Sequence, residues 1–248
     1  MLLLVDAGNT QIKWALADRA APPGAWLVSG AVPHAQIESL AALWQTLAID
    51  QVLLSNVAGA AVQKQLQESV PAHTPTECFA ASAQRAGLQN QYRDPAQLGC
   101  DRFAAAIGAR AAFPATSLIV ATCGTATTVD AITAEGVFLG GMILPGLGLM
   151  ASALASNTAL LPQVAHANMS VSTFADNTQD AIISGCLAAQ AGAIERAVQV
   201  HGGADVVRCI ISGGAGQWVA AHLSVPHQRV DNLVLLGLFS VANDILPC

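Results

Sequence analysis

The 248-residue chain has little charge. Lysine and arginine number 10 and aspartate and glutamate 16, so charged residues make up 10% of the sequence, against about 25% in typical domains. At 53% hydrophobic residues, the chain is too apolar to be disordered and can bury a large core. With a net charge of −6 and only two lysines, Lys13 and Lys64, it lacks the basic surface that binds nucleic acid. We expect no nucleic acid partner.

Clustered cysteines and histidines are also missing. No Cys-x-x-Cys pair indicates a zinc or redox site, and Pro226 interrupts the helical face that His222 and His227 would need to bind a metal together. Scattered cysteines fit a reduced, cytoplasmic protein best. The six are Cys78, Cys100, Cys123, Cys186, Cys209 and Cys248.

One long run has no charged residue. It lies between Glu135 and Asp176 and is longer than the roughly 20 residues of a membrane-spanning helix. Glycine and proline interrupt it and no basic cluster flanks it. At the N-terminus, the apolar segment Leu2–Val5 has no basic residue before it, unlike a signal peptide. We expect neither a membrane span nor a signal peptide.

The sequence contains an internal repeat. Leu2–Thr10 aligns with Leu118–Ala126, and each is a short apolar segment that runs into a glycine turn. The apolar-rich segments that follow, Gln11–Ala17 and Thr127–Ile132, predict the second strand of a hairpin. Two such hairpins, each at the head of a half of similar length, predict two related lobes that face each other across a cleft.

Helices and strands are predicted to alternate between the hairpins. Apolar residues at helical spacing predict a helix over 37–47. We also expect helices over the polar-rich segment 62–70, the alanine-rich segment 102–112 and the long segment 178–200, the last capped by Asn177 or Thr178. Further strands are expected over 51–54 and 207–212. This alternation indicates an α/β fold. We expect the boundary near Phe113–Pro114, with an N-terminal lobe over 1–114 and a C-terminal lobe over 115–248.

The segment Asp6–Lys13 contains the components of a phosphate site. Its glycine allows close backbone approach, its small polar residues can donate to phosphate oxygens, Lys13 adds a charge, and Asp6 can hold magnesium directly or through water. The alternative is an ordinary type I′ hairpin with Gly-Asn as its turn. Gly124–Asp130 adds a second glycine turn with several hydroxyls, and two turns around one triphosphate favour a nucleotide site.

An acid and a base precede the predicted third helix. Asp101 can accept the proton of a hydroxyl that attacks the γ-phosphate, and Arg102 can bind a substrate carboxylate. Alternatively, Asp101 caps the helix and Arg102 is solvated. The only tyrosine, Tyr92, either closes over a ligand or packs in the core with its hydroxyl bonded. The glycines of Ser212–Gly216 make either an adenine or ribose seat or a tight turn.

In order and spacing these segments resemble the type III pantothenate kinases, a family of the acetate and sugar kinase, heat-shock and actin superfamily. The resemblance spans the whole chain. It rests on Asp6–Lys13, Tyr92–Arg102, Gly124–Asp130, Gly140–Gly146, Asn177–Gly185, Ser212–Gly216 and Leu233–Leu238. It implies two actin-like (ribonuclease H-like) lobes and the ATP-dependent phosphorylation of the hydroxymethyl end of pantothenate, the first committed step towards coenzyme A.

The resemblance also implies individual roles and a homodimer. Asp101 matches the general base, Asp6 the magnesium-binding acid, and Thr125 a residue that touches the nucleotide phosphates. Thr178 matches a threonine that reaches pantothenate across the dimer interface, and the charge-free run is then buried structure and a dimer-facing surface. The other expected ATP contacts are Ala7, Gly8, Asn9, Thr10, Gln11, Ile12 and Lys13. The other expected pantothenate contacts are Tyr92, Gly99, Cys100 and Arg102.

One position departs from the family pattern. Many members have an aspartate three residues before the nucleotide-binding threonine, where it helps to bind potassium or ammonium. This chain has Thr122 there, and a neutral hydroxyl is a poorer ligand for a hard cation. A dependence on a monovalent cation is therefore in doubt, although other oxygens can still complete a site.

Two other functions use the same superfamily fold. A kinase of a sugar or another small hydroxy compound has less need of Arg102 for a carboxylate. A non-catalytic regulatory relative, such as a transcriptional accessory factor, has no need to keep Asp6, Asp101 and Arg102 together.

Overall fold

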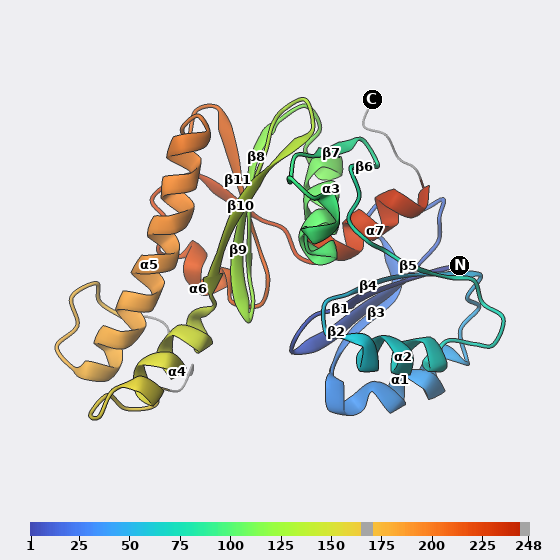
Figure 1. The fold of residues 1–248 in the computed structure, drawn as a ribbon, viewed down its shortest axis with the longest axis horizontal. Helices are drawn as coiled ribbons and strands as arrows, with labels where there is room; N and C mark the ends of the chain where they lie inside the picture. Colours follow the sequence, from blue (N-terminus) through green and yellow to red (C-terminus); the bar gives the residue numbers. More distant parts are fainter. Residues whose placement is uncertain (165–170, 244–248) are drawn as a thin grey trace. The chain divides into compact units, whose positions relative to one another are not determined.

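The computed structural model describes residues 1–164 and 171–243 and is an α/β fold with two sheets (Figure 1). The chain divides into two compact units. Unit 1 contains Met1–Ala115, Gly136–Phe138 and the chain from Asn232 onward, and unit 2 contains Thr116–Glu135 and Leu139–Asp231. The five described cysteines are free, and Cys248 lies outside the described residues.

Unit 1 is built on a five-stranded sheet in the order β3-β2-β1-β4-β5. Its central strand β1 pairs antiparallel with β2 and parallel with β4, so the predicted first hairpin is confirmed. A strand that is buried on both faces reads as a continuous apolar run, as β1 does. The strands are β1 (Leu2–Ala7), β2 (Gln11–Ala17), β3 (Trp26–Pro33), β4 (Gln51–Asn56) and β5 (Thr76–Cys78).

Helices cover this sheet. Those of unit 1 are α1 (Ile37–Trp44), α2 (Ala60–Ser69), α3 (Cys100–Ala112) and α7 (Leu233–Asn243), with the short turns η1 (His34–Gln36) and η2 (Pro95–Gln97). Side chains of α1 and α2 share a core cluster with those of β1, β2 and β4, and α3 and α7 pack on each other and on the sheet (Figure 1).

The last helix departs from the expected division of the chain. We expected residues 115–248 to form the C-terminal lobe, but α7 belongs to unit 1. The reason is its close packing on α3: a Cβ at Gly237 would overlap the carbonyl oxygen of Ala104. The break between Ala115 and Thr116 lies one residue from the expected boundary.

Unit 2 repeats the strand order of unit 1. Strand β8 pairs antiparallel with β9 and parallel with β11, as β1 does with β2 and β4. The seven-stranded sheet has the order β12-β11-β8-β9-β10-β7-β6, whose first five strands, read in reverse, match β3-β2-β1-β4-β5. The strands that unit 2 contributes are β8 (Ser117–Cys123), β9 (Ala126–Ile132), most of β10 (Val137–Pro145), β11 (Val207–Ser212) and β12 (His227–Arg229). The last two strands of the sheet, β6 (Gln84–Arg85) and β7 (Leu88–Asn90), belong to unit 1, where β7 pairs with Val137 and Phe138 at the start of β10.

The helices of unit 2 are α4 (Leu147–Asn157), α5 (Thr178–His201) and α6 (Gly216–Ala220). Among the described helices, α5 is long and apolar enough to cross a membrane by length and composition. Its buried residues recur every three or four positions and join the core of unit 2, which is the pattern of a core helix. The charge-free run forms β10, α4 and part of the chain that leads to α5, and its residues 165–170 lie outside the described residues.

Candidate functional site

The first hairpin places an acid and a base side by side in unit 1. Asp6 on β1 and Lys13 on β2 are direct cross-strand partners, so their side chains share one face of the sheet. Burial raises the pKa of Asp6 from 3.8 to about 7, the nearby Asp101 acts in the same direction, and Lys13 opposes both. Within the described residues, the buried Oδ1 of Asp6 has no hydrogen-bond partner. Such an oxygen is suited to a bound cation.

The same hairpin limits which expected ATP contacts can use side chains. Ala7 and Ile12 are buried in the core, because strand residues alternate between faces, so only their backbone can reach a ligand. Asn9, Thr10 and Gln11 are exposed. Neither Gly8 nor Asn9 has the positive φ that a type I′ turn requires. The alternative of an ordinary type I′ hairpin is therefore wrong.

A histidine that the sequence did not single out contacts this turn. The Nε2 atom of His34 lies 2.7 Å from the carbonyl oxygen of Gly8, while the amide of Gly8 donates to the carbonyl of Gln11 at 3.1 Å. The two partners of the first bond are 26 residues apart, and their contact depends on the pairing of β3 with β2.

Asp101 lies in the first turn of α3. The N-cap of this helix is Gly99, so Asp101 is not the N-cap. Its Oδ1 accepts a hydrogen bond from the amide of Arg102 at 2.8 Å. A Cβ at Gly99 would lie only 2.6 Å from that oxygen, so this carboxylate position requires glycine at 99. Asp101 also lies close enough to Asp6 to raise its pKa.

Arg102 and Tyr92 contact each other. Arg102 is only 7% exposed, so the alternative of a solvated arginine is wrong. Its Nη1 donates to the Tyr92 hydroxyl at 2.8 Å, and its guanidinium carbon lies 5.7 Å from the ring centre of Tyr92 and 5.8 Å from that of Phe138. The Arg102 guanidinium thus makes cation–π contacts with two aromatic rings. Arg102 directly follows Asp101 in the chain.

The side chain of Cys100, also expected to contact pantothenate, is directed towards β4. The Sγ of Cys100 accepts a hydrogen bond from Ser55 at 3.4 Å and donates to the carbonyl of Asn56 at 3.5 Å. Burial raises the pKa of this thiol. The Cys100 side chain therefore packs against β4, and only its backbone is available to a substrate.

In unit 2, three glycine-containing segments meet at the second turn. The amide of Gly146 donates to the carbonyl of Thr125 at 2.9 Å, and the amide of Ala215 donates to the carbonyl of Cys123 at 3.1 Å. Beside the turn is a cavity of about 360 Å³. It is lined by Gly124, Thr125, Leu147, Gly148, Leu149, Ser152, Ala215 and Trp218. Segments that the sequence places far apart thus form one pocket around Thr125.

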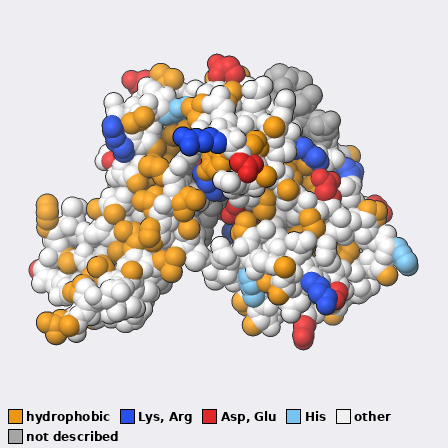
Figure 2. All heavy atoms as spheres, viewed as in Figure 1, with side chains coloured by type: hydrophobic (Ala, Val, Ile, Leu, Met, Phe, Trp, Pro, Cys, Tyr) orange, Lys and Arg blue, Asp and Glu red, His pale blue; other side chains and the backbone are white. Residues whose placement is uncertain are grey.

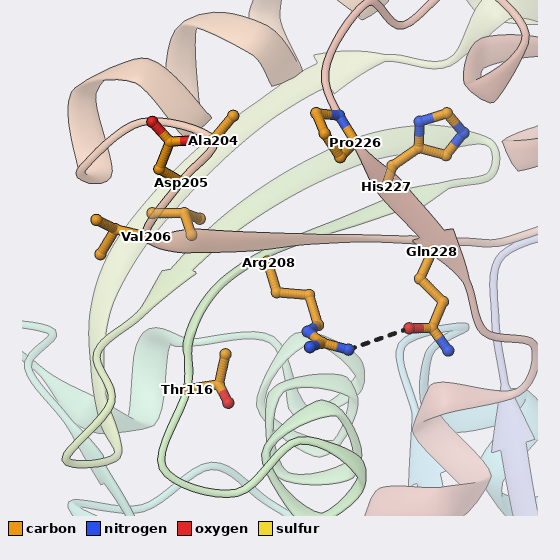
Figure 3. A pocket seen from close by; sticks show the side chains of 9 residues that line it. Thr116, Ala204, Asp205, Val206, Arg208, Pro226, His227 and Gln228 are labelled. Carbon is orange, nitrogen blue, oxygen red and sulfur yellow. Dashed lines mark hydrogen bonds between the residues drawn. The ribbon is translucent and has the colours of Figure 1, made fainter.

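A second cavity of unit 2, of about 320 Å³, lies at the opposite end of the strands (Figure 3). It surrounds the start of β11, where Arg208 donates to Gln228 at 3.4 Å, whereas Thr125 follows the end of β8. Its lining residues are Thr116, Ala204, Asp205, Val206, Val207, Arg208, Pro226, His227 and Gln228. It contains none of the predicted site residues, so the cavity at Thr125 is the better candidate.

Thr122 and Thr178 are the remaining predicted positions of unit 2. Thr122 pairs with Thr128 across the hairpin and with Ser212 on β11, as Asp6 pairs with Lys13 and Ser55 in unit 1. Its partners in the sheet are thus hydroxyl residues. Thr178 is the exposed first residue of α5, and Asn177 caps the helix by accepting from the amide of Asp180 at 3.0 Å.

Solved structures of other proteins share this fold. A protein from Sinorhizobium meliloti assigned as a 2-dehydro-3-deoxygalactonokinase matches with a TM-score of 0.64 at 18% identity, over 100% of both chains. A Campylobacter jejuni protein assigned to the Baf family of transcriptional activators matches at 0.60 and 19%, over 96% of each chain. These likenesses show the fold, which is the actin-like α/β fold found among sugar kinases.

The chain belongs to the type III pantothenate kinase family. The family model described as type III pantothenate kinase matches residues 2–200. A type III pantothenate kinase of Herminiimonas arsenicoxydans is 56% identical over 256 residues, covering 100% of this chain and 99% of the relative. Another, from Janthinobacterium sp. (strain Marseille), is 57% identical over 254 residues, covering 98% and 97%.

Proposed function

We propose that the chain transfers the γ-phosphate of ATP to the hydroxymethyl oxygen of pantothenate, the first step of coenzyme A biosynthesis. The observation that carries this proposal is the arrangement in unit 1, where the Asp101 carboxylate lies near Asp6 and is followed directly by the buried Arg102. Family membership supplies the substrate. The free cysteines fit a reducing compartment, and we place the reaction in the cytoplasm.

Asp101 acts as the general base. It accepts the proton of the pantothenate hydroxyl as the oxygen attacks the γ-phosphorus in line with the leaving ADP. Phosphoryl transfer needs little covalent help from the protein, so positioning and charge neutralisation carry most of the rate. Arg102 supplies a charge of the sign that pairs with the pantothenate carboxylate, and its bond to Tyr92 fixes the direction of the guanidinium.

Asp6 holds the magnesium ion, directly or through water. Its buried Oδ1 without a partner in the described structure fits a hard cation that prefers carboxylate oxygens. When bound, magnesium neutralises phosphate charge. Lys13, opposite Asp6 on β2, adds a second positive charge for the ATP phosphates.

The cavity at the second turn receives the nucleotide. The Thr125 turn presents small polar groups suited to phosphate oxygens, while Leu149 and Trp218 add apolar walls that suit the flat base or the ribose. The segment Ser212–Gly216, which the sequence suggested as a binding site for adenine or ribose, contributes Ala215 to the lining of this pocket.

We propose that the chain forms a homodimer, as the family resemblance implies, and unit 2 has a surface suited to a subunit interface. Hydrophobic side chains gather over β10 and α5 on the face shown in Figure 2. The large exposed ones on β10 are Leu139, Met142 and Ile143. An apolar patch of this kind marks a protein interface, and Thr178 lies in the same unit, where a partner subunit can use it.

A substrate panel tests the proposed function. Purified protein with magnesium ATP is assayed for ADP release with pantothenate, with sugars, and with an analogue of pantothenate whose carboxylate is an amide. We expect turnover with pantothenate, none with the sugars, and a raised KM for the amide because Arg102 loses its partner. Turnover of a sugar in place of pantothenate would favour the alternative kinase, and no turnover of any hydroxy compound would favour the regulatory alternative.

A further inference from the structure

His34 lies beside the turn that we propose holds the ATP phosphates. It directly follows β3, whose last residue Pro33 pairs with Gln11 at the start of β2. Its Nε2 is 2.7 Å from the Gly8 carbonyl oxygen, which is a good hydrogen-bond distance. A carbonyl only accepts hydrogen bonds, so Nε2 carries the proton and donates it. The ring therefore binds the turn through a backbone atom.

This bond fixes the direction of one peptide group. The peptide between Gly8 and Asn9 is trans, so its carbonyl and its amide point in opposite directions. With the Gly8 carbonyl directed at His34, the Asn9 amide points away from the ring. That amide has no hydrogen-bond partner in the part of the chain that the structure describes. The Asn9 amide is therefore a hydrogen-bond donor whose direction is fixed and which is available to a ligand.

Without the bond, the turn has another conformation open to it. Glycine tolerates a wide range of backbone angles, so the peptide after Gly8 can rotate and exchange the places of its carbonyl and amide. The rotated peptide would direct a carbonyl oxygen to the place of the Asn9 amide. A phosphate is attracted to amides and repelled by carbonyl oxygens, so only the conformation that His34 holds suits a phosphate ligand.

We propose that His34 is a positioning residue that holds the Gly8–Asn9 peptide so that the Asn9 amide faces a phosphate oxygen of the nucleotide. The inference rests on the proposed function, because it takes the ligand of this turn to be ATP. It adds a contact outside the predicted site segments, reached only through the pairing of β3 with β2.

The test compares variants at His34 with a matched control. His34→Ala removes the donor, and His34→Gln restores an amide donor of similar reach. The control is His201→Ala, because the Nε2 of His201 makes the same kind of bond, 3.0 Å to the carbonyl of Ile132 at the end of β9. For each protein the dissociation constant of magnesium ADP is measured by calorimetry, together with the KM values for ATP and pantothenate and the melting temperature.

We expect His34→Ala to weaken magnesium ADP binding and raise the KM for ATP by about 5- to 10-fold, the effect of one net hydrogen bond, with the KM for pantothenate unchanged. His34→Gln should recover most of the loss. His201→Ala should lower the melting temperature to a similar extent and leave nucleotide affinity at the wild-type value.

Asn9→Pro provides a second test, which does not depend on a change to the histidine. It removes the proposed amide, so combining it with His34→Ala should cost little more than either change alone. Nucleotide affinity at the wild-type value in His34→Ala, or an equal loss in His201→Ala, would overturn the inference. A wild-type protein that binds magnesium ADP and does not phosphorylate pantothenate would instead contradict the proposed function.

Discussion

The buried carboxylate of Asp6 lowers the stability of the folded protein, and we propose that it also binds magnesium. Its pKa is raised from 3.8 to about 7, mainly by burial, so between these values the folded protein binds a proton that the unfolded chain has lost. Stability therefore falls as pH rises through this window. A buried acid that destabilises the protein in this way is typical of a functional site.

The first prediction concerns Asp6→Asn. Relative to the wild type, this variant should gain stability as the pH rises from about 4 to 7, by about 4 kcal/mol at roughly 1.4 kcal/mol per pKa unit. Thermal melting of both proteins across this pH range measures the difference. Magnesium should raise the melting temperature of the wild type at pH 8 and leave that of Asp6→Asn unchanged. A difference between the two proteins that does not vary with pH would contradict the raised pKa.

The second prediction concerns Thr122. Because its partners on β9 and β11 are Thr128 and Ser212, the position offers neutral hydroxyls to a cation. We expect turnover to change little when sodium is replaced by potassium or ammonium at constant ionic strength. Thr122→Asp should gain a potassium-dependent rise in melting temperature. Strong potassium dependence of the wild type would show that other oxygens of the protein complete a cation site.

Candidate site residues could be named from the sequence where the chemistry is local. Asp6, Asp101 and Arg102 stand out because each follows or precedes a recognisable strand or helix end. The burial of Arg102 between two rings was not predictable, because Phe138 comes from β10, far along the chain. His34 was missed for the same reason, since its partner Gly8 is reached only through the sheet.

At the scale of elements, the N-terminus of α3 determines where the proposed base, Asp101, lies. Its N-cap Gly99 leaves room for the Asp101 carboxylate, and the adjacent Arg102 points to Tyr92 from the same turn. One helix end thus places the proposed base and the proposed carboxylate-binding group together.

The third prediction is that Gly99→Ala damages catalysis while sparing nucleotide binding. The added Cβ would lie 2.6 Å from the Asp101 Oδ1, so the carboxylate must move. Misplacing a catalytic group by about 1 Å can cost on the order of 100-fold in rate, and we expect a fall in kcat of that order. Single-turnover kinetics and magnesium ADP calorimetry separate the two effects. Unchanged kcat would mean that the carboxylate position is not critical.

Elements with periodic spacing or a turn signal were predicted well. Strand β11 matches its expected bounds, α1, α2 and α3 match theirs within a few residues, and α5 begins at Thr178 with Asn177 as its cap. Strand β3 was missed because it is an edge strand with mostly exposed residues. Helices α4 and α7 were missed because their largely apolar sequences have no clear helical face.

At the scale of the whole molecule, the repeat explains the equivalence of the two sheets. The aligned hairpins of the sequence are β1–β2 and β8–β9, and the strand orders around them correspond. The place of α7 in unit 1 could not be predicted, because it depends on a backbone contact with α3 more than 100 residues earlier.

The fourth prediction concerns the dimer. Ile143 on β10 is 65% exposed and Leu27 on the equivalent strand β3 is 58% exposed. If the apolar surface of unit 2 is the interface, Ile143→Asp should convert the dimer into a monomer, and the matched control Leu27→Asp should not. Light scattering measures the mass of each. A wild-type protein that is monomeric at micromolar concentration would contradict the interface.

Identification of the product tests the proposed phosphorylation of pantothenate most directly. Pantothenate is incubated with magnesium ATP carrying a labelled γ-phosphate, and the label is followed by phosphorus NMR and mass spectrometry for the wild type and for Asp101→Asn. We predict that the wild type transfers the label to the hydroxymethyl oxygen of pantothenate, and that Asp101→Asn binds ATP nearly normally but forms no product. Label released only as inorganic phosphate, or substantial product from Asp101→Asn, would contradict the proposed reaction.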